Sequence, residues 1–106
     1  MIDIENLRAH YLNDMVFMTN HASERSRQRG IFAKDIRNAV MTGEIIEDYP
    51  NDFPFPSCLV YGKSLDGKVI HVCISDEGES SRIITAYIPS LEKWETDLKT
   101  RKEASK

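Results

Sequence analysis

Three residues, His21, Arg25 and Arg29, recur at intervals of four within the run 20–30. On a helix that turns roughly 100° per residue, this spacing places all three side chains within about 80° of arc. The run contains no large apolar side chain, so imidazole and guanidinium groups stand where an amphipathic helix has its apolar stripe. Arginine can bind phosphate through two parallel hydrogen bonds, and histidine titrates near neutral pH. The pattern therefore indicates a small anion or phosphate site.

A second group of candidate residues lies in the C-terminal half of the chain. His71 stands in the strand-like segment 68–75, and Thr85 and Tyr87 are two residues apart in the strand-like segment 82–88. Side chains alternate between the two faces of a strand, so Thr85 and Tyr87 share a face. If the apolar residues between them point into the core, His71 lies on that same opposite face. We also expect His21 or Arg25 to approach the same end of the sheet.

These two groups could together cleave RNA without a metal ion. The reaction needs a base for the 2′-hydroxyl proton, an acid for the 5′-oxygen and fixed cations beside the phosphoryl oxygens. His21 and His71 could divide the proton transfers, and Tyr87 could stack on a base or donate a hydrogen bond. The candidate residues are His21, Arg25, His71 and Tyr87 for catalysis, with Arg29 and Thr85 for binding.

The same residues also fit a site without catalysis. A histidine inside a strand is commonly a hydrogen-bonded structural residue, and arginines on a helix commonly lie in solvent. A basic helix could equally bind an acidic partner protein or a nucleotide. The residues therefore leave two functions open, a metal-independent endoribonuclease and a non-catalytic binding module, so whether the protein is an enzyme stays open as well.

Other chemistries find no support in the spacing of the residues. His10, His21 and His71 do not have the intervals of a metal-binding motif, and Cys58 and Cys73 form no CxxC pair. The chain has no Walker loop, no GxGxxG and no GxSxG. We therefore expect neither a metal nor another cofactor.

The composition is that of one soluble domain covering residues 1–106, with 41% hydrophobic and 29% charged residues. The net charge of −3 argues against broad attraction to nucleic acid or to an anionic membrane, and we expect no DNA partner. Residues 20–40 nevertheless carry five basic and two acidic side chains, a local charge of +3. The chain shows no secretory signal and no membrane span, and its two cysteines are expected to be free thiols. A cytoplasmic location follows as an expectation.

The apolar periodicity predicts helices over 3–13, 20–29 and 33–42, with a short strand at 15–18. Asp3 is expected to cap the first helix, Thr19 or Asn20 the second, and Gly30 ends the second. A final helix is predicted from Ser90, with one face formed by Leu91, Trp94 and Leu98.

The main sheet is expected to be antiparallel and to have about four strands, at 44–49, 57–62, 68–75 and 82–88. The result is an α+β domain whose helices pack on one face of this sheet. A two-residue turn at Asp66-Gly67 closes the clearest hairpin and pairs Leu65 with Lys68.

This turn fixes the expected register of the hairpin. It places Leu59 opposite Ile74, Tyr61 opposite Val72 and Gly62 opposite His71. The core face is then expected to hold Ile70, Val72 and Ile74 together with Ile84, Ala86 and Ile88. The opposite face is expected to hold Cys58, Val60, His71, Cys73, Ile83, Thr85 and Tyr87, with one end covered and the other open.

Several short motifs occur in an order that resembles a bacterial family, domain of unknown function 4258. They are His21-Ala-Ser-Glu-Arg25, Arg29-Gly-Ile31, Asp35-Ile36, Gly43-Glu-Ile-Ile-Glu-Asp-Tyr-Pro50, Leu59-Val-Tyr-Gly62, His71-Val72 and Thr85-Ala-Tyr-Ile-Pro89. The resemblance runs from about residue 15 to about residue 95. The helix before it and the predicted helix from Ser90 are additions to the shared part.

That family is similar to the barnase–EndoU–colicin–RelE group of small ribonuclease-like folds. The resemblance implies N-terminal helices packed on an antiparallel sheet, and an endoribonuclease role of toxin type. RNA and an antitoxin-like protein are the partners it implies. The matching site residues are His21, Arg25, Arg29, His71, Thr85 and Tyr87. This chain departs from such toxins in being acidic, whereas they are usually basic.

Overall fold

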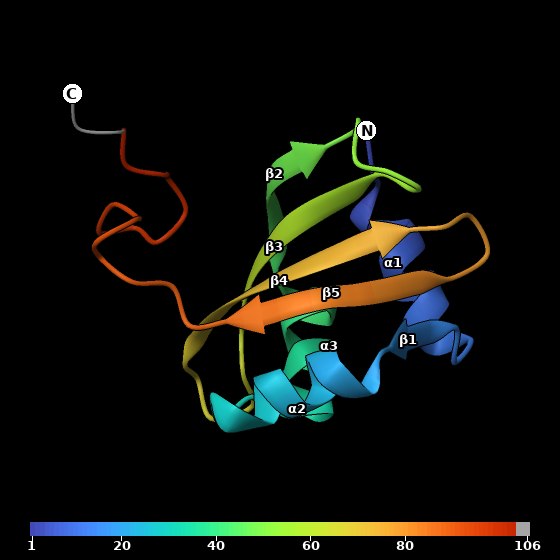
Figure 1. Cartoon of the computed structure of the whole chain (residues 1–106), viewed down its shortest axis with the longest axis horizontal. Coiled ribbons are helices and arrows are strands. Elements are labelled where there is room, and N and C mark those ends of the chain that lie inside the picture. Colours follow the sequence, from blue (N-terminus) through green and yellow to red (C-terminus); the bar gives the residue numbers. More distant parts are fainter. Residues whose placement is uncertain (104–106) are drawn as a thin grey trace.

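A sheet of five strands in the order β1-β5-β4-β3-β2 forms the centre of the fold (Figure 1). The computed structural model describes residues 1–103, and within them the α+β class is confirmed. Each predicted helix before the main sheet and each predicted strand lies within one residue of its expected bounds. The elements are α1 (Ile4–Leu12), β1 (Val16–Met18), α2 (Asn20–Gln28), α3 (Ala33–Thr42), β2 (Glu44–Tyr49), β3 (Ser57–Lys63), β4 (Val69–Asp76) and β5 (Ser81–Tyr87).

One face of the sheet packs against α1 and α3, and this layer contains the core. Leu7 from α1 and Ile36 and Val40 from α3 are almost completely buried there. They meet the inward side chains of the strands, which are Cys58, Val60, Ile70, Val72, Ile74, Ile83 and Ala86. We call this the core face, and the opposite side of the sheet the outer face. The expected free thiols are found, since Cys58 and Cys73 form no disulfide.

Helix α2 lies beside β5 rather than over the middle of the sheet (Figure 1). Thr19 caps it by accepting a hydrogen bond from the backbone of Ala22, as expected. Its buried residues are the small Ala22 and Ser26. Small residues on the packed side explain why the sequence shows no large apolar stripe, and they leave the cationic residues of α2 exposed.

Two predictions about the elements are wrong. The sheet has five strands rather than about four, because β1 pairs in parallel with the first half of β5. The helix predicted from Ser90 does not form: residues 88–103 make turns, with one isolated bridge between Trp94 and Arg101. Leu91 is exposed, Trp94 is 1% exposed and Leu98 has a positive φ of 59°, so the three side chains do not share a helix face. Packing of Trp94 on the sheet outweighs helical periodicity here.

The hairpin between β3 and β4 has a different turn from the one predicted. Its loop contains three residues rather than two, because the backbone N–H of Ser64 donates to the carbonyl of Lys68. Gly67 takes the left-handed conformation that such a loop requires, with φ at +88°. The extra residue moves the register by one position, so Tyr61 pairs with His71 and Gly62 with Ile70. Cys58 and Val60 consequently lie on the core face.

A bulge in β5 also changes which residues face the core. The register of β5 shifts near Ile84, so Ile83 pairs with Ile74 and is 3% exposed, whereas Ile84 is 47% exposed. Ile88 is exposed as well. The expected core positions of Ile84 and Ile88 and the expected outer position of Ile83 are therefore wrong. The bulge restores the predicted face for Thr85 and Tyr87, which pair with Cys73 and His71.

Among the described residues, no helix has both the length and the apolar character needed to cross a membrane.

A close contact between α3 and β3 predicts a position that is sensitive to substitution. A Cβ added to Gly62 would lie 2.7 Å from the Cβ of Ala39 and 2.5 Å from its carbonyl oxygen. We expect Gly62→Ala to lower the free energy of unfolding by about 1–3 kcal/mol, because α3 must move away from β3. Lys63→Ala, an exposed change one residue away, should cost less than about 0.5 kcal/mol. Urea denaturation of both variants measures this difference, and equal stabilities would contradict the packing argument.

Candidate functional site

Four side chains form a line across the outer face of the sheet, and we call them the outer row. Glu44 of β2 pairs with Tyr61 of β3, Tyr61 pairs with His71 of β4, and His71 pairs with Tyr87 of β5. Residues paired across strands point to the same face, so the row follows directly from the register. The expectation that His71 and Tyr87 lie together is confirmed, and Nδ1 of His71 is 3.2 Å from the hydroxyl of Tyr87.

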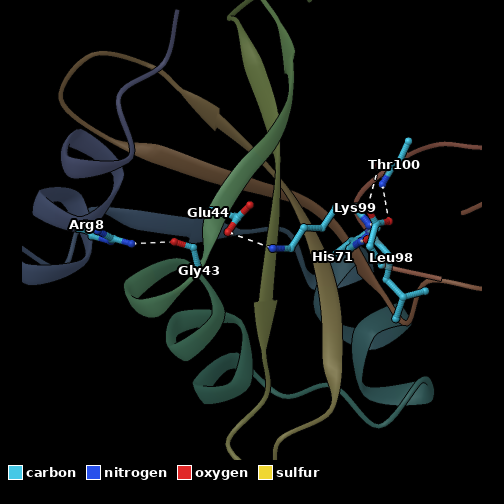
Figure 2. A network of polar contacts seen from close by, with 8 residues as sticks. Arg8, Gly43, Glu44, His71, Leu98, Lys99 and Thr100 are labelled. Carbon is cyan, nitrogen blue, oxygen red and sulfur yellow. Dashed lines mark hydrogen bonds and ion pairs between the residues drawn. The ribbon is translucent and has the colours of Figure 1, made fainter. Parts of the chain in front are cut away.

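His71 is completely buried, although it lies on the outer face. Residues 89–103, which we call the C-terminal strap, cover it. The carbonyl of Leu98 lies 2.7 Å from Nε2, and the Trp94 ring packs edge-on at 4.5 Å between centroids. Figure 2 shows the sheet between α3 on one side and this strap on the other. The expectation of one covered end of this face is confirmed.

The hydrogen bonds of His71 determine its tautomer. A carbonyl oxygen can only accept, so Nε2 carries the proton and donates it to Leu98. Nδ1 is then an acceptor, and the Tyr87 hydroxyl donates to it. Burial lowers the pKa of His71 from its ordinary value and raises that of Tyr87. His71 is therefore a neutral imidazole whose two nitrogens are both occupied in this conformation.

Charged contacts hold the strap against β2. Arg101 donates two hydrogen bonds to Glu47, of 3.1 Å and 2.9 Å, and lies 4.5 Å from the Trp94 ring centroid. Lys99 is 3.3 Å from Glu44 and lies over the Tyr61 ring (Figure 2). The Arg101 hydrogen bonds are the main reason that the pKa of Glu47 is lowered. The strap thus pairs two cations with Glu44 of the outer row and with Glu47 of the same strand.

A cleft of about 360 Å³ opens beside the outer row. We call it the cationic cleft, and its lining residues are Arg29, Tyr87, Ile88, Ser90, Lys93, Trp94 and Arg101. Arg29 directly follows α2, Lys93 and Arg101 come from two parts of the strap, and Tyr87 lines the cleft with them. Arg29 donates one hydrogen bond of 2.9 Å to the carbonyl of Ala86, so most of its five N–H groups remain available to a ligand.

A smaller hollow of about 200 Å³ lies between α2 and β5. Its lining includes His21, Arg25, Arg29 and Thr85, together with Ala22 and Ile84. Arg29 lies 3.5 Å from the Thr85 hydroxyl and contributes to both spaces. His21 and Arg25 are exposed. Four of the predicted residues therefore meet at this hollow, and Arg29 joins them to the cleft that contains Tyr87.

The predicted site residues thus fall into two groups rather than one. His21, Arg25, Arg29 and Thr85 border the hollow beside α2, whereas His71 and Tyr87 belong to the outer row. Of the six predicted site residues, only Tyr87 and Arg29 line the cationic cleft. The third histidine, His10, bonds Ser81 and the carbonyl of Gly78 in the opposite part of the fold.

The sequence argument missed the residues that β2, β3 and the strap contribute to the site, namely Glu47, Tyr61, Lys93, Trp94 and Arg101. Lys93, Trp94 and Arg101 were missed because a helix was predicted from Ser90. For Glu47 a signal existed in the doublet Ile45-Ile46, because two successive apolar residues break strand alternation and here coincide with a bulge. The doublet Ile83-Ile84 marks the second bulge in the same way.

A family described as domain of unknown function, DUF4258, matches residues 18–88. The chain belongs to this family. The six predicted site residues all lie inside the DUF4258 part, and the strap lies outside it. Neither the search of curated proteins nor the search of solved structures found a match. The DUF4258 description states no function, so the chemistry has to be argued from the site.

The buried His71 predicts how stability depends on pH. Its folded pKa lies below the ordinary value of 6.5, so its contribution to stability is complete above about pH 6.5. As the pH falls from there toward the folded pKa, protonation of the unfolded chain removes it, by up to about 1.4 kcal/mol per pH unit.

Unfolding free energies between pH 5 and 8 test this. The difference between the wild type and His71→Phe should shrink as the pH falls. His21→Gln, which removes an exposed histidine, should keep the wild-type profile. A wild-type to His71→Phe difference that is constant across this range would contradict a depressed pKa.

Proposed function

We propose that this protein binds the phosphate groups of a nucleotide or of a short single-stranded RNA in the cationic cleft. The observation that carries the proposal is that Arg29, Lys93 and Arg101 line one cleft together with Tyr87. Guanidinium groups hold phosphate oxygens in parallel pairs, and a lysine ammonium adds a point charge. Because this charge is concentrated in one cleft of an acidic protein, the site suits a small anion better than a long duplex.

Two features favour a nucleotide over a simple anion. The cleft adjoins the aromatic and imidazole side chains of the outer row, on which a base could stack once the strap moved off them. The hollow beside α2 continues the cationic surface through His21 and Arg25, so a second phosphate could lie there. RNA is therefore the ligand that uses most of the surrounding residues.

A second candidate function, RNA cleavage, rests on the hydrogen bond between Tyr87 and His71. The 2′-hydroxyl of a bound strand would pass its proton to the Tyr87 oxygen while Tyr87 passes its own proton to Nδ1 of His71. The 2′-oxygen would then bond to phosphorus as the bond to the 5′-oxygen breaks, and the proton would return through Tyr87 to the 5′-oxygen. Arg29 and Arg25 would stabilise the charge on the phosphoryl oxygens. The expected toxin-type role and an antitoxin-like partner depend on this second candidate.

Phosphate binding predicts a difference between two arginines of the same helix. Arg29→Gln should weaken binding of a short single-stranded RNA about tenfold or more, because hydrogen bonds between charged groups are lost. Arg27, exposed two residues earlier and absent from the cleft lining, is the matched control, and Arg27→Gln should change binding less than about twofold. Fluorescence anisotropy measures both, with thermal melting to confirm that each variant is folded.

Salt dependence adds an independent measure of the same contacts. Three cations on a single strand should give a slope of log K against log salt of about −2, and Arg29→Gln should make it shallower. RNA binding with no salt dependence, or binding that Arg27→Gln and Arg29→Gln weaken equally, would contradict a site in the cleft.

Cleavage predicts a different set of losses. Labelled RNA should be cut in the presence of EDTA, and Tyr87→Phe, His71→Ala and Arg25→Ala should each reduce the rate by about 100-fold or more. Tyr87→Phe should leave RNA affinity nearly unchanged, since the phenol is not one of the cations. Cutting that survives Tyr87→Phe and His71→Ala would exclude this relay. Absence of cutting together with binding that depends on Arg29 would leave the protein as a binding module.

A further inference from the structure

The side chains of the outer row are more polar than a buried sheet face requires. Tyr61, His71 and Tyr87 present a buried imidazole between two phenol rings, at 6.3 Å and 5.3 Å between centroids. A buried imidazole needs hydrogen-bond partners, which Tyr87 and Leu98 supply here, whereas apolar side chains would fill the same space without needing any. The row therefore has the composition of a surface that recognises a flat, polar ligand.

The strap makes the contacts with the outer row that such a ligand would make. Its tip, residues 96–100, brings the Leu98 carbonyl to Nε2 of His71 and the Lys99 ammonium to the Tyr61 ring (Figure 2). A nucleobase with a ring carbonyl carries the same acceptor on a ring that can stack against Tyr61. Glu44 belongs to the row and Glu47 lies on the same strand, so a neutral base fits there and a phosphate does not.

The tip is held separately from the base of the strap. Trp94 and Arg101 anchor the base, where Lys102 donates to the carbonyl of Lys93, and the Glu95 N–H bonds the Thr100 carbonyl at the junction of base and tip. The tip is shaped by Asp97, which accepts the backbone N–H groups of Lys99 and Thr100, both at 2.9 Å. Leu98 has a φ of 59°, which is unfavourable for a leucine. The tip could thus move while Trp94 and Arg101 keep the cleft intact.

We propose that the outer row is a binding site for a nucleobase with a ring carbonyl, such as uracil or guanine, and that the tip of the strap occupies this site until the base displaces it. The inference rests on the proposed function, because the cationic cleft would hold the phosphate of the same nucleotide. Tyr87 and Trp94 belong to both places, since they line the cleft and contact His71.

The first experiment adds uridine monophosphate to the wild-type chain of 106 residues and follows its NMR signals. Binding should change the backbone amide signals of Leu98 and Lys99, which leave His71 and Tyr61 when the tip opens, and should shift the ring signals of His71. Adenosine monophosphate, whose base has no ring carbonyl, should produce less than about a third of either change. Uridine monophosphate that binds without altering the tip amides or the His71 signals would overturn the proposal.

The second experiment opens the tip by substitution. Asp97→Ala should raise the affinity for uridine monophosphate about tenfold or more and should leave ribose 5-phosphate within about twofold of the wild type. Asp66→Ala is the matched control, because Asp66 is also an exposed carboxylate that holds a loop, through the Ser64 hydroxyl, away from the row. An equal gain for both ligands, or the same gain in Asp66→Ala, would overturn the proposal.

The two proposals fail in different ways. If ribose 5-phosphate does not bind, or binds independently of Arg29, the proposed phosphate site is wrong. If ribose 5-phosphate binds through Arg29 but uridine monophosphate binds no more tightly to Asp97→Ala, only the base site is wrong. If uridine itself opens the tip while ribose 5-phosphate does not bind, the base site stands without the phosphate site.

Discussion

The arrangement of the outer face and of the strap depends on the hydrogen bonds of one buried imidazole, that of His71. His71 donates to the Leu98 carbonyl and accepts from the Tyr87 hydroxyl, so both nitrogens are satisfied without water. An unpaired buried nitrogen would cost roughly 1–3 kcal/mol, which favours a strap that stays closed. Trp94 covers the ring and Arg101 covers Trp94, so the position of the whole C-terminal strap follows from the requirement to satisfy His71.

The same requirement creates the cationic cleft. Because the strap must cross the end of β5 to reach His71, it carries Lys93 and Arg101 to the place where Arg29 of α2 already lies. The small buried residues Ala22 and Ser26 let α2 lie beside β5, and this position brings Arg29 to the Ala86 carbonyl. The contacts that hold the C-terminal strap over His71 therefore also form the cationic cleft. A ligand bound in the cleft would alter the stability of the strap in this position.

Local sequence determined most of the fold before the strap. Asp3 and Thr19 cap the helices expected of them, and each predicted strand lies within one residue of its observed bounds. The expected sharing of a face by His71, Thr85 and Tyr87 is confirmed, although the predicted register of the hairpin is off by one residue. The prediction of a shared face still holds because the bulge at Ile84 places Thr85 and Tyr87 on the same face as His71. The different turn changes only which residues of β3 pair with β4.

The sequence by itself determined the helices, the strand order of the antiparallel hairpins and the cationic face of α2, because these depend on caps, turns and periodicity within short segments. Only the tertiary structure decided which candidates meet. The strap has a helical apolar pattern, yet Trp94 packs on His71 and Leu98 turns its carbonyl toward the imidazole. Such contacts join residues more than twenty positions apart, and their free energy outweighs a weak local helix preference. The cover over His71 and the cleft beside it therefore exist only in the folded chain.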